Sequence, residues 1–131
     1  MRRKKLAKGL LKLYMRAEYN DREDQKVTGD FYSFSPARLG IGAIYTKNLH
    51  RHWTYSGSLY LQQSLFMDPD KRGGVFKTRQ DGLMEFRLRL TKLSFSKWLY
   101  RASYIHASNS SNYSEFSYDQ DVVSFEILKA F

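Results

Sequence analysis

Apolar side chains recur at every second residue along most of this chain, and that is the period of a β-strand. The last segment shows it clearly, because Val123, Phe125, Ile127 and Phe131 fall on one set of alternate positions, together with Lys129. A strand sends alternate side chains to opposite faces, so one face can meet a hydrophobic environment and the other water. The same alternation earlier in the chain predicts a sheet with one apolar and one polar face.

Polar stretches, or stretches that contain Gly or Pro, separate the alternating segments. We expect strands over residues 9–19, 26–34, 38–47, 53–61, 83–90, 97–106 and about 120–131, with connections at 20–24, 47–52, 67–80 and 107–118. Strands of about ten residues cross a bilayer when they are tilted. The sequence thus predicts an all-β fold of one domain over residues 1–131, an antiparallel up-and-down transmembrane β-barrel, or part of one, with about seven or eight strands.

No stretch of the chain reaches the roughly 20 apolar residues that a membrane helix needs. The longest clean run, Leu39–Tyr45, holds two glycines, and the mean hydropathy is −0.59. Any membrane insertion would therefore use strands. The chain has a basic start, but Lys8 and Lys12 interrupt the apolar core that a signal peptide would need, and no small-x-small cleavage site follows. We expect an outer-membrane location that depends on an export signal upstream, and a chain that is a fragment or a truncated reading frame.

Charged residues inside the predicted strands fall on the polar set of positions. The net charge is +9, from 22 Lys plus Arg against 13 Asp plus Glu. Because both signs occur opposite the apolar set, we interpret these residues as the lining of a hydrated, ion-paired lumen. The predicted lumen-lining residues are Lys12, Arg16, Glu18, Glu85, Arg87, Arg89 and Arg101.

Two soluble alternatives fit the same alternation. A one-sided soluble sheet would place its polar face in water and its apolar face in a shared dry core. An oligonucleotide-binding barrel is also basic and aromatic, but it clusters Lys, Arg and exposed aromatics on one face, and here they are segregated. The aromatic residues near the ends of the apolar sets favour the membrane interpretation; they are Tyr19, Trp53, Tyr55 and Trp98. Because charges and aromatics are segregated, we expect no nucleic-acid partner.

No motif in the chain points to catalysis or to a cofactor. Cysteine is absent, which excludes thiolate zinc sites and a cysteine nucleophile. His50 and His52 lie in a predicted turn, and Asp68-Pro69-Asp70 lacks the rest of an EF-hand loop. No nucleophile elbow accompanies the serines. We expect no enzyme activity, no catalytic or metal-binding residue and no cofactor; a barrel enzyme is a third hypothesis.

The second half of the chain contains five segments that carry a family resemblance: Phe76-Lys77-Thr78-Arg79-Gln80-Asp81, Arg101-Ala102-Ser103-Tyr104, Ser108-Asn109-Ser110-Ser111-Asn112, Phe116-Ser117-Tyr118-Asp119-Gln120-Asp121-Val122-Val123 and Lys129-Ala130-Phe131. Together they resemble the C-terminal end of the surface lipoprotein assembly modifiers of Gram-negative bacteria. In that family an Arg-x-Ser-Tyr strand leads to an Asn/Ser-rich loop, and a Tyr-Ser-Tyr-Asp-like segment opens a last strand that ends Lys-x-Phe. Glu115 and Phe116 depart from this pattern.

The resemblance implies that residues 1–131 are the C-terminal portion of an outer-membrane barrel domain, in a protein that helps lipoproteins or related secreted proteins reach the cell surface. The family also has a periplasmic helical-repeat domain, and this chain holds no helical repeat. The implied partners are outer-membrane lipid, the barrel-assembly machinery and a lipoprotein or secreted protein substrate. Outer-membrane barrels usually end on a lipid-facing aromatic, so we expect Val123, Phe125, Ile127 and Phe131 to form the assembly signal. The alternative is a soluble basic β-barrel that binds a ligand or nucleic acid.

Overall fold

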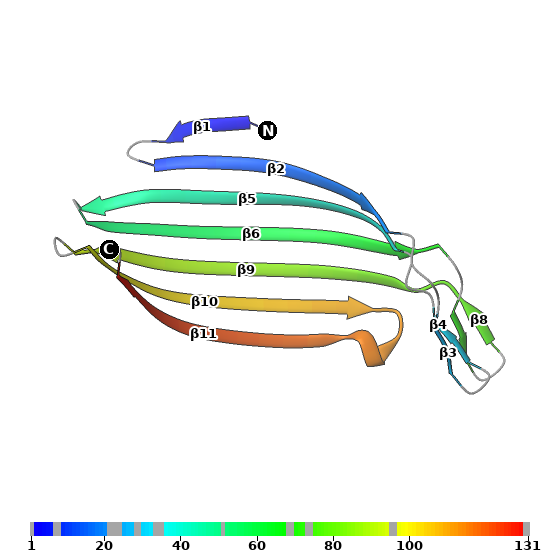
Figure 1. The fold of residues 1–131 in the computed structure, drawn as a ribbon. Coiled ribbons are helices and arrows are strands. Elements are labelled where there is room, and N and C mark those ends of the chain that lie inside the picture. The colour runs from blue at the N-terminus through cyan, green and yellow to red at the C-terminus, as the bar shows by residue number, and fades with distance from the viewer. Residues whose placement is uncertain are drawn as a thin grey trace.

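The computed structural model describes residues 2–6, 9–20, 25–27, 30–32, 36–50, 52–67, 70–72, 75–94 and 97–129. A seven-stranded antiparallel sheet dominates them (Figure 1). Its strands are β1 (Arg2–Leu6), β2 (Gly9–Tyr19), β5 (Pro36–His50), β6 (Trp53–Phe66), β9 (Gln80–Leu93), β10 (Trp98–Ser111) and β11 (Tyr118–Lys129). The described residues contain no α-helix, and one turn of 3₁₀ helix, η1 (Ser114–Phe116), precedes β11. The all-β, antiparallel prediction is confirmed.

The order of the strands in the sheet follows their order in the chain. Each strand pairs antiparallel with its neighbours in the series β1-β2-β5-β6-β9-β10-β11, which is an up-and-down meander. The connections alternate in length. Residues 7–8, 51–52 and 94–97 make short connections at one end of the sheet, and residues 20–35, 67–79 and 112–117 make longer ones at the other. We call these the short-turn end and the long-loop end.

A second, smaller sheet lies at the long-loop end (Figure 1). Its strands, in order, are β3 (Gln25–Val27), β4 (Asp30–Tyr32), β7 (Asp70–Arg72) and β8 (Val75–Lys77). The prediction of one long strand over residues 26–34 is therefore wrong. Because β2 and β5 pair directly with each other from Gly9–Lys47 to Tyr19–Ala37, no strand of the main sheet lies between them. The predicted connection over 67–80 likewise contains two short strands.

The polar stretch 107–118 is a loop only in its second half. β10 continues to Ser111, and Ser108 pairs with Met84 of β9 and with Asp119 of β11. Backbone hydrogen bonds on both sides hold this Ser/Asn-rich segment extended, although its side chains show no alternation. The structure thus lengthens the predicted strand 97–106 at the long-loop end.

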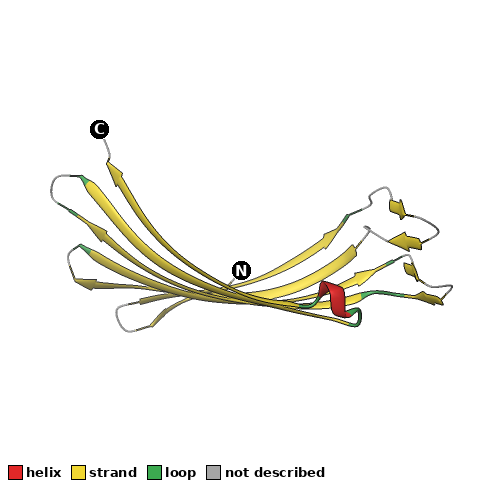
Figure 2. Cartoon of the chain, turned by 90° about the horizontal axis from the view of Figure 1, so that it is seen from below, coloured by secondary structure: helices red, strands yellow, loops and turns green. Residues whose placement is uncertain are grey.

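The main sheet is curved but open among the described residues (Figure 2). β11 pairs with β10 alone, and no pairing joins it to β1 or β2. Closure of a barrel requires the edges of the first and last strands to meet. The two edges are unequal here, since β1 has 5 residues and β11 has 12. A closed barrel is therefore not what the described residues form by themselves.

Buried apolar side chains are nearly absent from the described residues. Phe66, which is 4% exposed, is the one large apolar side chain among them that is buried, whereas Met15 is 73% and Val123 81% exposed. A single sheet has no second layer to cover its apolar face. The described part of the sheet therefore presents a large apolar surface with no dry core behind it.

Candidate functional site

All seven predicted lumen-lining residues lie on one face of the sheet, which we call the polar face. The register shows this directly: the row that starts at Lys12 passes Ile44 and Ser58 and reaches Arg87. Their side chains are half-buried, except that of Arg16, which is exposed. Side chains on the inner side of a curved sheet crowd together, so this burial indicates that the polar face is concave.

One ion-paired cluster on the polar face joins β2 to β5. Glu18 accepts a 2.6 Å contact from Arg16 and a 3.3 Å contact from Arg38, and the amide of Asn20 donates to it at 2.6 Å. Sequence reasoning missed Arg38, although its position two residues before Gly40 in the alternation already assigned it to this face. The cluster neutralises the one predicted acidic residue of β2.

Further polar contacts on the same face lie within β9 and between β10 and β11. Arg87 contacts Glu85 at 3.1 Å, Arg101 contacts Glu126 at 2.7 Å, and the hydroxyls of Ser103 and Ser124 hydrogen-bond at 2.7 Å. The sequence argument missed Glu126, which alternates with the apolar set of β11. Within the described part of the chain, Lys12 and Arg89 form no ion pair. The polar face is thus rich in paired charges and carries an excess of cations.

Two tyrosines fill the space above the glycines of β5 on the polar face. Tyr14 from β2 and Tyr60 from β6 stack with ring centroids 6.0 Å apart. A Cβ atom at Gly42 would overlap the ring of Tyr14, and one at Gly40 the ring of Tyr60. The glycines therefore leave room for aromatic rings that cover the backbone of a central strand.

The opposite face is apolar and exposed. Its large side chains form a continuous band, and we call this the apolar band. Several are more than half exposed, among them Leu39, Ile41 and Phe125. The band consists of Leu11, Leu13, Met15, Ala17 and Tyr19 in β2, Leu39, Ile41, Ala43 and Tyr45 in β5, Leu59, Leu61 and Leu65 in β6, Met84, Phe86, Leu88 and Leu90 in β9, Ala102 and Tyr104 in β10, and Val123, Phe125 and Ile127 in β11.

The apolar band crosses the strands obliquely. Its middle lies at Met15 in β2 and at Phe125 in β11. Pairing from Met15 across the sheet arrives instead at Asp119, six residues before Phe125, by way of Ile41, Leu61, Met84 and Ser108. Six residues span about 20 Å along a strand, and the five strand spacings span about 24 Å. The strands are therefore tilted about 40° from the normal to the band, within the roughly 35–45° tilt of outer-membrane barrel strands.

Lysines and aromatics line the edge of the apolar band at the short-turn end. The ammonium of Lys92 lies 5.2 Å from the ring centroid of Trp53, and that of Lys129 lies 5.3 Å from the ring centroid of Trp98. Both tryptophans of the chain are in these two pairs. We call the full set the interface belt, and it consists of Lys47, Trp53, Tyr55, Lys92, Trp98, Tyr100 and Lys129. Sequence reasoning found the two tryptophans and Tyr55 but not the lysines.

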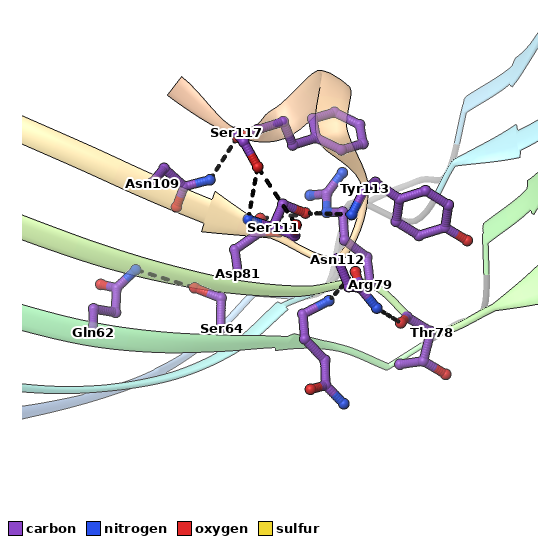
Figure 3. A network of polar contacts seen from close by, with 12 residues as sticks. Gln62, Ser64, Thr78, Arg79, Asp81, Asn109, Ser111, Asn112, Tyr113 and Ser117 are labelled. Carbon is purple, nitrogen blue, oxygen red and sulfur yellow. Dashed lines mark hydrogen bonds and ion pairs between the residues drawn. The ribbon is translucent and has the colours of Figure 1, made fainter. Parts of the chain in front are cut away.

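A buried arginine ties the loops together at the long-loop end (Figure 3). The guanidinium of Arg79 lies 3.4 Å from the ring centroid of Phe66 and 4.0 Å from that of Phe116, and its Nε is 3.4 Å from Asp81. Asn112 supports it, since its amide donates to the Thr78 carbonyl at 2.8 Å. Three of the segments on which the family resemblance rests, 76–81, 108–112 and 116–123, therefore meet in one place.

The predicted assembly signal lies on the exposed edge strand β11. Val123, Phe125 and Ile127 share the apolar face and are 81%, 66% and 52% exposed. Phe131 lies outside the described residues, so only the strand part of the signal is placed. The arrangement leaves these side chains accessible to another protein or to lipid.

The titratable side chains of the described residues are dispersed over the sheet. No group of three His, Cys, Asp or Glu side chains gathers there, and no helix of this part of the chain is long and apolar enough to cross a membrane. His106 contacts Asp121 at 3.0 Å, and Tyr104 donates to the same carboxylate at 2.6 Å, but no hydrogen bond joins His106 to a serine. His50 ends β5 instead of lying in a turn, and Asp68 and Pro69 are outside the described residues.

Comparison of the chain with protein-family models, with curated proteins and with solved structures gives no match. The two-faced sheet itself is therefore the basis for a functional assignment.

Proposed function

We propose that this chain is a wall segment of an outer-membrane β-barrel that assists the display of lipoproteins or related proteins at the bacterial surface. The observation that carries the membrane part is the inverted distribution of polarity. Charged side chains are crowded on the concave face, and large apolar side chains such as Met15, Ile41 and Phe125 are exposed on the other. That distribution suits a hydrated lumen on one side and lipid on the other.

The oblique course of the apolar band supports the same proposal through a second quantity, the tilt of the strands. A soluble one-sided sheet has no reason to shift its apolar positions by six residues between β2 and β11. A bilayer imposes such a shift, since a flat apolar slab meets tilted strands at different residues. The asymmetry of the connections also fits, because outer-membrane barrels have short periplasmic turns and longer extracellular loops.

The display function rests on the family resemblance and on the cation-rich polar face. In this proposal Lys12, Arg16, Glu18, Glu85, Arg87, Arg89 and Arg101 line the aqueous side of the wall. Val123, Phe125, Ile127 and Phe131 are the signal for the barrel-assembly machinery. No residue has a catalytic role, and no cofactor takes part.

The experiment is fractionation of cells that produce the chain behind a supplied signal peptide, followed by gel electrophoresis with and without heating. We expect recovery in the outer membrane and a band whose mobility shifts on heating. Soluble recovery with a β-type circular dichroism spectrum would overturn the membrane proposal and favour a soluble binding module. For display, a tagged lipoprotein should become protease-accessible on intact cells that carry the chain; unchanged accessibility with normal outer-membrane recovery would remove the display role alone.

A further inference from the structure

The seven residues of the interface belt lie at one depth once the strand tilt is taken into account. Along the strands they are spread over three successive rows of the apolar face, from Lys47 and Tyr55 to Trp98 and Lys129. With a tilt of about 40°, the same residues fall within about 6 Å of one another along the normal to the apolar band. Residues that occupy different rows of five strands therefore lie at nearly the same height along the normal to the apolar band.

The height of the interface belt matches the boundary between the hydrocarbon core of a bilayer and its headgroups. Its mean depth is about 11 Å from the middle of the apolar band, and half of the roughly 25 Å apolar height of an outer-membrane barrel is about 12 Å. Indole and phenol rings collect at this level because one part of each ring system is apolar and the other polar. Lysine stems can reach outward from it and place their ammonium groups among lipid headgroups.

We propose that the interface belt binds the phosphate groups of anionic phospholipids in the leaflet at the short-turn end, an inference that rests on the proposed membrane function. Its positions carry three lysines and no acidic residue, so its charge complements an anionic surface. The ammonium groups of Lys92 and Lys129 lie close to the rings of Trp53 and Trp98, so in each pair the charge and the ring share one level of the sheet. The belt thereby sets the depth and the tilt of the wall.

The depth of the belt is measured by tryptophan fluorescence of the whole chain refolded into vesicles. Because Trp53 and Trp98 are the only tryptophans, all of the emission reports on the belt. Lipids brominated near the headgroup should quench it more strongly than lipids brominated near the chain ends. Stronger quenching from the chain ends would overturn the inference while leaving membrane insertion intact. No quenching by either lipid, with no heat-shifted band, would instead overturn the proposed function.

The charge of the belt is tested with vesicles of phosphatidylcholine alone and of phosphatidylcholine mixed with phosphatidylglycerol. A lysine near an anionic surface contributes about fivefold to binding, so Lys92→Gln with Lys129→Gln should lower the preference for the anionic vesicles by about 25-fold. The matched control is Lys71→Gln with Lys77→Gln, since these two lysines lie in β7 and β8 beyond the other end of the apolar band. An equal loss in the control, or an unchanged preference in the belt variant, would overturn the inference even if both variants insert normally into neutral vesicles.

Discussion

Tyr14 and Tyr60 stack across the glycine-containing strand that separates them, with ring planes only 10° apart. The stack exists because β5 carries glycine at both positions beneath the rings. Gly42→Val should therefore lower the free energy of unfolding by about 1–3 kcal/mol, since a side chain there forces the Tyr14 ring aside. The measurement is the urea midpoint of the chain refolded in detergent micelles.

Gly82 provides the control for that substitution. A Cβ atom at Gly82 would meet its nearest neighbour, an oxygen of Gln63, at 3.6 Å, which is ordinary contact. Gly82→Ala should change the free energy of unfolding by less than about 1 kcal/mol. Equal effects of Gly42→Val and Gly82→Ala would show that the tyrosine stack is not what requires glycine in β5.

The proposed function predicts that the two faces of the sheet respond differently when a lysine is introduced. Ile41→Lys places an ammonium group near the middle of the apolar band and should cost about 2–4 kcal/mol of folding free energy in vesicles. Leu83→Lys makes the same kind of change on the polar face, between Asp81 and Glu85 on the same strand, and should be nearly neutral. If both variants fold equally well in vesicles, the apolar face does not contact lipid.

The sandwich of Arg79 between Phe66 and Phe116 predicts that charge alone cannot replace arginine there. Arg79→Lys keeps the positive charge but loses the planar group that covers both rings, so it should lower the free energy of unfolding by about 2 kcal/mol. The variant should also make residues 112–117 more sensitive to limited proteolysis. A lysine variant that matches the original chain in both assays would assign the site to charge pairing with Asp81.

The proposed assembly signal on β11 predicts how the recovery of the chain in the outer membrane responds to substitution. Phe125→Asp should reduce recovery in the outer membrane several-fold, because it puts a carboxylate on the exposed apolar set of the edge strand, which the proposed function places against lipid. Gln120→Asp, on the polar face of the same strand, is the control and should leave recovery unchanged. Deletion of Phe131 should resemble Phe125→Asp. Recovery that is equal for all three would remove the assembly signal from this strand.

Alternation predicted the strands and their faces wherever one face is apolar. Residues 9–19, 53–61 and 83–90 all lie within strands, and the parity of their side chains assigned Lys12, Arg16 and Arg87 to the same face. What alternation could not reveal is any strand outside the apolar band. Residues 107–111 are polar on both sets, yet neighbours on both sides hold them extended.

The interface belt and the Arg79 cluster could not be predicted from the sequence, for a different reason. Lys92 and Trp53 are far apart in the chain, and only the register between β6 and β9 brings them side by side. Arg79 lies in a segment that the sequence presents as a loop, and its two aromatic partners come from β6 and η1. Both depend on cross-strand register, which the alternation of a single strand does not determine.

The open edge of β11 has a consequence for how this sheet enters a bilayer. Its outer row of backbone N–H and C=O groups faces no strand among the described residues. Each such group left unpaired in hydrocarbon costs several kcal/mol. Under the proposed function, the sheet would therefore not first dissolve in lipid as an isolated ribbon and find a partner strand later. Insertion and the pairing of β11 with another strand would then occur as a single step, so the rate of insertion should depend on the availability of a strand that can pair with β11.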